Sequence, residues 1–318
     1  MPTEPPAAAR RILLLGGDGQ LAWELRRSLA PLGEVIAVGR QTLPHRLDLT
    51  QTGAILPLVE TLRPHWIVNA AAYTAVDRAE AEPELAHAVN GRAPGALAEA
   101  AARVGAQLLH YSTDYVFDGG ARRPYREDDL PNPQSVYGAS KLAGERALAE
   151  SGCDWLILRT AWVYGARGGN FLRSIRRLAR EREELRVVAD QIGAPTWSRQ
   201  IAEASAQILA RLGDDRAAWH RACGIYHLSA AGETSWHSFA ERIVAHQRCR
   251  ERIPCTAVRA IGTAEYPTAA RRPAYSVLDN TWLATAFGIR LPDWQVGLAQ
   301  VQEELDLGLD PAPPASAA

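Results

Sequence analysis

The chain has 318 residues, of which 47% are hydrophobic and 22% charged, and its formal net charge is −1. That balance predicts a globular fold with an ample core. A net charge so close to zero does not indicate the strongly basic surface that binds nucleic acid or an anionic membrane. No apolar run approaches the roughly 20 residues of a membrane-spanning helix. The four cysteines form no CxxC pair, which predicts reduced thiols, a cytoplasmic protein and no metal site.

Short apolar runs alternate with helical patterns through the first half of the chain. This alternation is typical of a parallel sheet covered by helices on both faces. It predicts an α/β fold, a doubly wound parallel sheet of the Rossmann type, over residues 10–165. We expect strands at 11–15, 34–38, 65–69, 107–112 and 155–159, and helices at 20–25, 53–63, 82–104 and around 137–141.

The alternation loosens after about residue 165. An arginine-rich helix is expected at 172–186, followed by a proline-containing loop. We therefore expect residues 166–308 to form mainly a second, smaller α/β substrate-binding lobe, free to return strands or helices to the Rossmann domain. The active site is expected in the cleft between the two. Residues 1–9 and 309–318, rich in proline and alanine, are expected to be disordered tails.

A glycine turn follows the first expected strand. Gly16 and Gly19 stand three apart, with Ala22 three further along. Such glycines let a pyrophosphate approach the positive end of a helix, so the turn predicts a dinucleotide site; a plain tight turn is the alternative. Arg40 after the second strand favours the 2′-phosphate of NADPH over NADH, although an exposed arginine is ordinary in so arginine-rich a chain. Asp48 is placed either to meet the adenine edge or to begin a helix.

Small and hydroxyl-bearing residues follow the third and fourth expected strands. Residues 69–74 (Asn-Ala-Ala-Ala-Tyr-Thr) either leave room for a ligand at the carboxyl edge of the sheet or allow close helix packing. Thr113 ends the fourth strand. There its hydroxyl can donate a hydrogen bond to a substrate carbonyl that becomes negative during hydride attack. Serine, threonine and aspartate are also common turn residues, which is the structural alternative.

Lys141 is the only lysine among the 35 lysine and arginine residues. Tyr137 precedes it by four residues, so the two side chains share one face of a helix. A nearby ammonium group lowers the pKa of a tyrosine from its usual value of about 10, which predicts a phenol acting as a proton donor. A tyrosine and a lysine at this spacing also occur by chance on protein surfaces. Thr113, some two dozen residues earlier, completes a three-group site.

Seven runs in order carry a family resemblance. They are residues 19–25 (GQLAWEL), 68–77 (VNAAAYTAVD), 110–117 (HYSTDYVF), 136–145 (VYGASKLAGE), 159–164 (RTAWVY), 190–196 (DQIGAPT) and 271–273 (RRP). Over residues 10 to about 305 the chain resembles the extended short-chain dehydrogenase/reductases, and among them most the dTDP-4-dehydrorhamnose reductases. The resemblance implies NADPH-dependent reduction, with NADH as an alternative, of the 4-keto group of dTDP-4-dehydro-L-rhamnose to dTDP-L-rhamnose.

The resemblance also implies roles for single residues. Tyr137 would give a proton to the C4 oxygen, Lys141 would hold the nicotinamide ribose and lower the tyrosine pKa, and Thr113 would polarise the keto group. Sugar-nucleotide contacts are implied for Thr113, Asp114 and Trp162, with Arg271 or Arg272 at the diphosphate. Cofactor contacts are implied for Gly16, Gly19, Gln20, Leu21, Arg40, Asp48, Leu49, Ala72, Tyr73, Thr74, Tyr111, Tyr137 and Lys141.

One departure concerns magnesium, which some family members bind through three glutamates at a dimer interface. Glu24 and Glu304 persist here, but Arg199 takes the middle position. An arginine cannot ligate a cation. The sequence therefore argues against this Mg²⁺ site and leaves a homodimer as an open prediction, while no nucleic-acid or membrane partner is expected.

Two other functions fit parts of the sequence. A 4,6-dehydratase or epimerase shares the fold, but a dehydratase carries a second acid directly after the strand-end threonine, and here Tyr115 follows Asp114. A non-catalytic regulatory subunit, like the methionine adenosyltransferase partner that resembles this family, would show a drifted catalytic set. Because Thr113, Tyr137 and Lys141 are all present, we favour the reductase.

Overall fold

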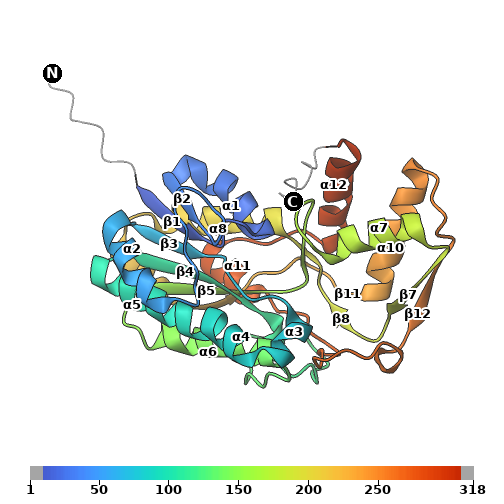
Figure 1. The fold of residues 1–318 in the computed structure, drawn as a ribbon, viewed down its shortest axis with the longest axis horizontal. Coiled ribbons are helices and arrows are strands. Elements are labelled where there is room, and N and C mark those ends of the chain that lie inside the picture. Colours follow the sequence, from blue (N-terminus) through green and yellow to red (C-terminus); the bar gives the residue numbers. More distant parts are fainter. Residues whose placement is uncertain (1–9, 309–318) are drawn as a thin grey trace.

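The computed structural model describes residues 10–308, and the predicted tails lie outside the described residues. Its centre is a six-stranded parallel sheet in the order β2-β1-β3-β4-β5-β10, covered by helices on both faces (Figure 1). The strands are β1 (Arg11–Leu15), β2 (Glu34–Val38), β3 (Trp66–Asn69), β4 (Gln107–Thr113), β5 (Trp155–Thr160) and β10 (Gly224–His227). The predicted Rossmann-type fold is confirmed.

The sheet buries apolar side chains on both faces, which is why its strands are continuously apolar. On one face Ile12 and Leu14 of β1 pack with α1 (Gln20–Leu29), α8 (Ser198–Leu212), α9 (Arg216–Ala222) and α11 (Thr281–Phe287). On the other face Leu13 and Leu15 pack with α2 (Ile55–Leu62), α5 (Ala93–Val104) and α6 (Val136–Ala149). Short helical turns η1 (Ala30–Leu32), η2 (Thr52–Ala54) and η4 (Asp114–Val116) join these elements.

Two expected helices differ from the structure. The helix expected at 82–104 is divided into α4 (Pro83–His87), a π-helical turn η3 (Ala88–Arg92) and α5, after a separate helix α3 (Val76–Ala81). The helix expected at 172–186 ends early, as α7 (Phe171–Glu181), and a strand, β7 (Glu184–Val188), follows. Leu185 and Val187 of β7 are buried and alternate with Arg186, a two-residue period that fits a strand and not a helix.

A smaller part has its own apolar core, built by α7, α10 (Trp236–Arg250) and α12 (Trp294–Asp306). These helices lie together at the opposite end of the molecule from α2 and α5 (Figure 1). Strand β7 pairs with β12 (Ala257–Ile261), and β6 (Val163–Tyr164) with β9 (Thr196–Trp197), both in parallel. Strand β8 (Ile192–Gly193) pairs antiparallel with β11 (Thr234–Ser235), and η5 (Thr263–Glu265) completes this part.

Several elements beyond residue 165, α9 among them, belong to the central sheet and its covering layer. Strand β10 adds the sixth strand beside β5, α8 packs against α1, and α11 contacts β10. These are the returning elements that the domain prediction left open, and the division at residue 165 itself stays a prediction. Within residues 10–308, no helix combines the length and apolarity needed to cross a membrane.

Candidate active site

Helix α6 carries the predicted acid and its lysine. Ser135 begins the helix by accepting a hydrogen bond from Gly138 N at 3.1 Å. Gly138 is needed for packing, because a Cβ there would collide with the Tyr115 carbonyl oxygen. The first turn of α6 is thereby pressed against the end of β4, which brings Tyr137 beside Tyr115, with ring centroids 5.4 Å apart.

Thr113 connects the strand end to the tyrosine. Its hydroxyl donates to Asp114 Oδ1 at 3.0 Å and accepts from Tyr115 N at 3.2 Å. Burial raises the pKa of Tyr137 to about 12, while a hydrogen bond with the Thr113 side chain acts in the opposite direction. Thr113 and Tyr137 are therefore brought together at the carboxyl edge of the sheet, as predicted.

The side chain of Lys141 contacts strand β4. Its Nζ donates to the Tyr111 carbonyl oxygen at 2.6 Å and lies 3.2 Å from His110 Nε2. Burial lowers the pKa of Lys141 to about 8. Burial, and not Lys141, dominates the pKa of Tyr137 in this structure, so the lowering of that pKa by Lys141 stays a prediction.

The glycine turn forms as predicted between β1 and α1. Gly16 has φ of 82°, a left-handed conformation that favours glycine, and a Cβ there would lie 2.7 Å from Ala71 N. Gly19 N donates to the Gly16 carbonyl oxygen at 2.8 Å, and Gly19 begins α1 with no side-chain cap. The first backbone N–H groups of a helix that has no capping side chain are available to bind a pyrophosphate.

Residues predicted at the adenosine end lie near one another after β2. Arg40 is exposed and helps to lower the pKa of Asp48, although the main cause is the hydrogen bond from Thr50 N to Asp48 Oδ1, at 2.9 Å. Leu49 is buried beside them. The Asp48 carboxylate thus shapes the turn before η2 and α2, and the contact with adenine stays a prediction.

The segment after β3 is held by a buried asparagine that the sequence did not single out. Tyr73 N donates to Asn90 Oδ1 at 2.8 Å, and Asn90 Nδ2 donates to the Tyr73 carbonyl and to Ser140 Oγ, each at 3.0 Å. Asn90 lies in the π-helical turn η3, so the interruption of the expected helix positions this amide between Tyr73 and α6. Ala72 and Thr74 flank Tyr73 in the same segment.

The side chains of two predicted cofactor-binding residues form hydrogen bonds with other residues of the chain. The Tyr111 hydroxyl donates to Ser205 Oγ at 2.6 Å within the core, on the face covered by α8, so its carbonyl group is the part that reaches Lys141. The Gln20 amide donates to the Val163 carbonyl at 3.3 Å. Leu21, next to Gln20, packs against the same core. Contacts of Tyr111, Gln20 and Leu21 with a cofactor remain predictions.

The predicted substrate residues lie in separate segments of the chain and differ in their surroundings. Asp114 is 1% exposed, and burial raises its pKa to about 6. Trp162 has φ of 47°, unusual for a residue with a Cβ, and its indole stacks on Trp236 with centroids 3.4 Å apart. Arg271 and Arg272 line a cavity of about 420 Å³ together with Asp118, Asp190, Thr263 and Tyr266.

The two arginines are not equivalent. Arg272 is paired with Asp77 across the chain, with Nη2 2.7 Å from Oδ2, and is half-buried. Arg271 donates only to Gln134 Oε1, at 3.3 Å, among the hydrogen bonds found within residues 10–308, and it is exposed. Arg271 is therefore the arginine better placed to take a diphosphate without breaking an ion pair.

One protein family matches this chain along almost its whole length. The family described as RmlD substrate binding domain matches residues 10–307. The chain belongs to the RmlD family. A dTDP-4-dehydrorhamnose reductase of Burkholderia thailandensis is 51% identical over 296 residues, covering 91% of this chain and 97% of the relative. A protein of the same name from Escherichia coli K12 is 44% identical, covering 92% and 97%.

Solved structures of RmlD relatives superpose over nearly the whole chain. The dTDP-4-dehydrorhamnose reductase of Bacillus anthracis, solved in complex with NADP, has a TM-score of 0.82 at 34% identity and covers 93% of this chain and 99% of that one. A reductase of the same name from Clostridium acetobutylicum has a TM-score of 0.83 at 36% identity, covering 93% and 99%. Membership of the RmlD family therefore rests on both sequence and fold.

Arg199 occupies the position at which the family resemblance places a metal-binding glutamate. Its Nε donates to Glu24 Oε2 at 3.1 Å and its Nη2 to Glu304 Oε1 at 2.8 Å. The guanidinium joins α1, α8 and α12 by bridging the two carboxylates. Among residues 10–308, no group of three or more His, Cys, Asp or Glu side chains is arranged to hold a metal ion.

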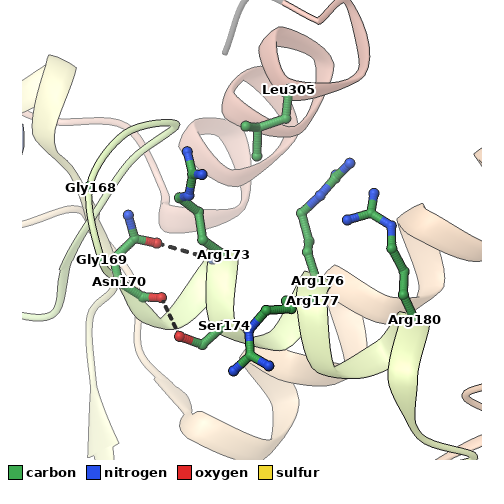
Figure 2. A pocket seen from close by; sticks show the side chains of 9 residues that line it. All are labelled: Gly168, Gly169, Asn170, Arg173, Ser174, Arg176, Arg177, Arg180 and Leu305. Atoms are coloured by element: carbon green, nitrogen blue, oxygen red, sulfur yellow. Dashed lines mark hydrogen bonds between the residues drawn. The ribbon is translucent and has the colours of Figure 1, made fainter. Parts of the chain in front are cut away.

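A second cavity, of about 370 Å³, lies away from the catalytic residues at the start of α7 (Figure 2). Arg176 and Arg180 point toward the side of α12, whereas Arg177 points away. Arg176 pairs with Asp306 at 2.9 Å and Arg180 with Glu251 at 2.7 Å. The positive charge of this arginine-rich cavity is thus largely matched by acids.

Proposed function

We propose that this chain reduces the 4-keto group of dTDP-4-dehydro-L-rhamnose to dTDP-L-rhamnose with NADPH. The observation that carries the proposal is the meeting of Thr113 and Tyr137 at the carboxyl edge of the sheet, with Lys141 buried one helical turn behind. The names of the relatives and the NADP in the Bacillus anthracis structure support this substrate and this cofactor. A cytoplasmic location and a homodimer remain predictions.

Tyr137 and Thr113 have separate roles in the proposed reduction, and other residues bind the cofactor. When bound, the nicotinamide supplies a hydride to C4 of the sugar. Tyr137 gives its phenolic proton to the C4 oxygen, so the carbonyl becomes a secondary alcohol. Thr113 orients and polarises that oxygen, which becomes negative as the hydride arrives. The glycine turn at Gly16 and Gly19 would receive the pyrophosphate, and Arg40 would hold the 2′-phosphate that distinguishes NADPH.

A direct assay tests the proposal. Purified protein is mixed with dTDP-4-dehydro-L-rhamnose and NADPH, and loss of the NADPH absorbance is followed together with the formation of dTDP-L-rhamnose. We expect turnover of both compounds in a one-to-one ratio. Absence of product from protein that binds NADPH would refute the proposed substrate. A parallel reaction with NADH, compared in wild type and Arg40→Ala, measures the contribution of Arg40 to cofactor choice.

A further inference from the structure

A carboxylate in the glycine turn joins that turn to the segment after β2. Asp18 Oδ2 accepts a hydrogen bond from Gln41 N at 3.2 Å, and Asp18 Oδ1 accepts one from the Thr42 hydroxyl at 2.7 Å. Gly17 N also donates to the Val38 carbonyl oxygen at 2.9 Å. Asp18 is exposed and therefore accessible to a ligand. The proposed reduction assigns no role to this residue.

The Asp18 carboxylate occupies the place of a side chain that the chain lacks. In dinucleotide-binding folds, an aspartate or glutamate about 20 residues beyond the glycine turn accepts a hydrogen bond from the 2′-hydroxyl of the adenosine ribose. Here that position, directly after β2, is Gly39. A Cβ on Gly39 would lie 2.6 Å from Asp18 Oδ2 and 3.0 Å from Asp18 Cγ. The carboxyl group of Asp18 therefore fills the space into which a side chain at position 39 would extend.

A carboxylate in this place distinguishes between the two nicotinamide dinucleotides. It accepts a hydrogen bond from the ribose 2′-hydroxyl of NADH, whereas it repels the negatively charged 2′-phosphate of NADPH. We infer that Asp18 is a specificity-determining residue, which supplies from the glycine turn the carboxylate that dinucleotide-binding folds carry after the second strand, and which keeps NADH usable beside NADPH. The inference rests on the dinucleotide site of the proposed function and is independent of the sugar substrate.

Arg40, the residue after Gly39, acts in the opposite direction. It is exposed, and in the proposed function its guanidinium holds the 2′-phosphate. Arg26 of α1 also approaches the glycine turn, but it is half-buried and its Nη2 donates to the Gly17 carbonyl oxygen at 3.3 Å. The cofactor preference therefore depends on the opposed charges of Asp18 and Arg40.

A purely structural role for Asp18 makes a different prediction. In that case the carboxylate would only hold the turn against the segment after β2, and its loss would weaken the binding of both dinucleotides alike. Asparagine can keep both hydrogen bonds, because its oxygen accepts from Gln41 N and its NH₂ group donates to the Thr42 hydroxyl oxygen, but it carries no charge. We therefore expect Asp18→Asn to bind NADPH more tightly, and NADH less tightly, than the wild type.

The test is a titration of the full-length protein with each dinucleotide, in the absence of any sugar nucleotide. Binding of NADPH and of NADH is measured by nucleotide fluorescence in wild type, in Asp18→Asn and in a control, Glu34→Gln. The control removes an exposed carboxylate at the opposite end of β2. The ratio of the dissociation constants, NADH over NADPH, should rise by about ten-fold or more in Asp18→Asn and stay unchanged in Glu34→Gln.

Three results of this titration would overturn the inference. The first is an unchanged ratio in Asp18→Asn, and the second is an equal rise in Asp18→Asn and in Glu34→Gln. The third is a wild-type protein that binds NADPH but has no measurable affinity for NADH.

Moving the carboxylate tests whether its place determines the preference. Asp18→Gly alone should raise the ratio as Asp18→Asn does. In Asp18→Gly/Gly39→Asp the carboxylate extends from the end of β2 into the same space, and the Thr42 hydroxyl, 2.7 Å from the new Cβ, has to turn aside. The ratio should return toward the wild-type value. A double variant that folds and keeps the ratio of Asp18→Gly contradicts the proposed placement; if it does not fold, the Asp18→Asn titration decides.

These outcomes are separate from a failure of the proposed function. Protein that shows the expected ratios but yields no dTDP-L-rhamnose would refute the proposed substrate and support the inference. Protein that binds neither dinucleotide would overturn both.

Discussion

Positive charge is treated in opposite ways at the two ends of the molecule. On α7, Arg177 and Arg180 are 62% and 47% exposed and pair with acids at the surface. On α6, the only lysine is buried, faces an imidazole and donates to a carbonyl group. Exposed pairs contribute little to stability, whereas a buried ammonium is costly. The energetic effect of a positive charge here therefore depends on its surroundings. The exposed arginines of α7 contribute less than the buried Lys141, although arginine is the more common residue.

The largest effect is expected at the buried end. Tyr137→Phe removes the group that protonates the C4 oxygen in the proposed reaction, so kcat should fall by about 10²–10⁴-fold. The fold and NADPH binding should be retained, as measured by circular dichroism and by fluorescence titration of NADPH. If the variant turns over at the wild-type rate, Tyr137 is not the proton donor.

Exchanging the two basic residue types tests the comparison itself. Lys141→Arg places a wide planar fork in a site filled by one nitrogen, and we expect kcat/KM to fall by roughly 10²-fold or more. The matched surface change, Arg177→Lys, keeps an exposed pair with Glu181 and should leave kcat/KM and the free energy of unfolding almost unchanged. Similar losses in both variants would remove the distinction between the two ends.

The pH dependence of stability offers a third test. The folded pKa of Lys141, about 8, lies below the unfolded value, so between about pH 8 and 10.4 the unfolded chain binds more protons and stability rises with pH. Lys141→Met lacks this gain. The difference in the free energy of unfolding, wild type minus variant, should grow by about 3 kcal/mol across that range, as measured by urea unfolding. A constant difference would mean that Lys141 is not desolvated.

The smallest effect concerns the strained tryptophan. A Cβ at Gly193 would collide with the indole of Trp162, so Gly193→Ala should destabilise the fold by about 1–3 kcal/mol and raise KM for the sugar nucleotide. Gly53→Ala is the control, because a Cβ there meets nothing within 4 Å. Equal thermal unfolding of the two variants would show that Trp162 is free to move aside.

The sequence predicted most of the sheet and the edge at which the proposed catalytic residues meet. Apolar runs located β1 and β2 at their observed bounds, and the spacing of Tyr137 and Lys141 placed both on α6. Motifs succeed here because glycine turns and helix spacing are local properties. Residues 83–104 are helical as expected, but alanine-rich periodicity does not register the π-helical turn that divides them and positions Asn90.

The raised pKa of Tyr137 and the contacts of His110 could not be derived from the sequence, for a different reason. Both depend on burial and on which strand lies beside which, and neither is written in the spacing of residues along the chain. His110 is the first residue of the run at 110–117, but its neighbours cannot be predicted from that run. Only the pairing of β3 with β4 brings His110 between Asn69 and Lys141. A polar residue inside an otherwise apolar strand was the available signal.

The burial of Lys141 also determines how the protein responds to amine chemistry. Arginine provides every other basic side chain among the 35 lysine and arginine residues, and Lys141 is 2% exposed. The surface therefore offers no ε-amine to acylating dyes, lysine-directed cross-linkers or acetyl donors. A lysine adduct can therefore form only when α6 moves away from the edge of the sheet and exposes Lys141. The rate of acylation, followed by mass spectrometry, would measure how often the proposed catalytic centre is exposed to solvent.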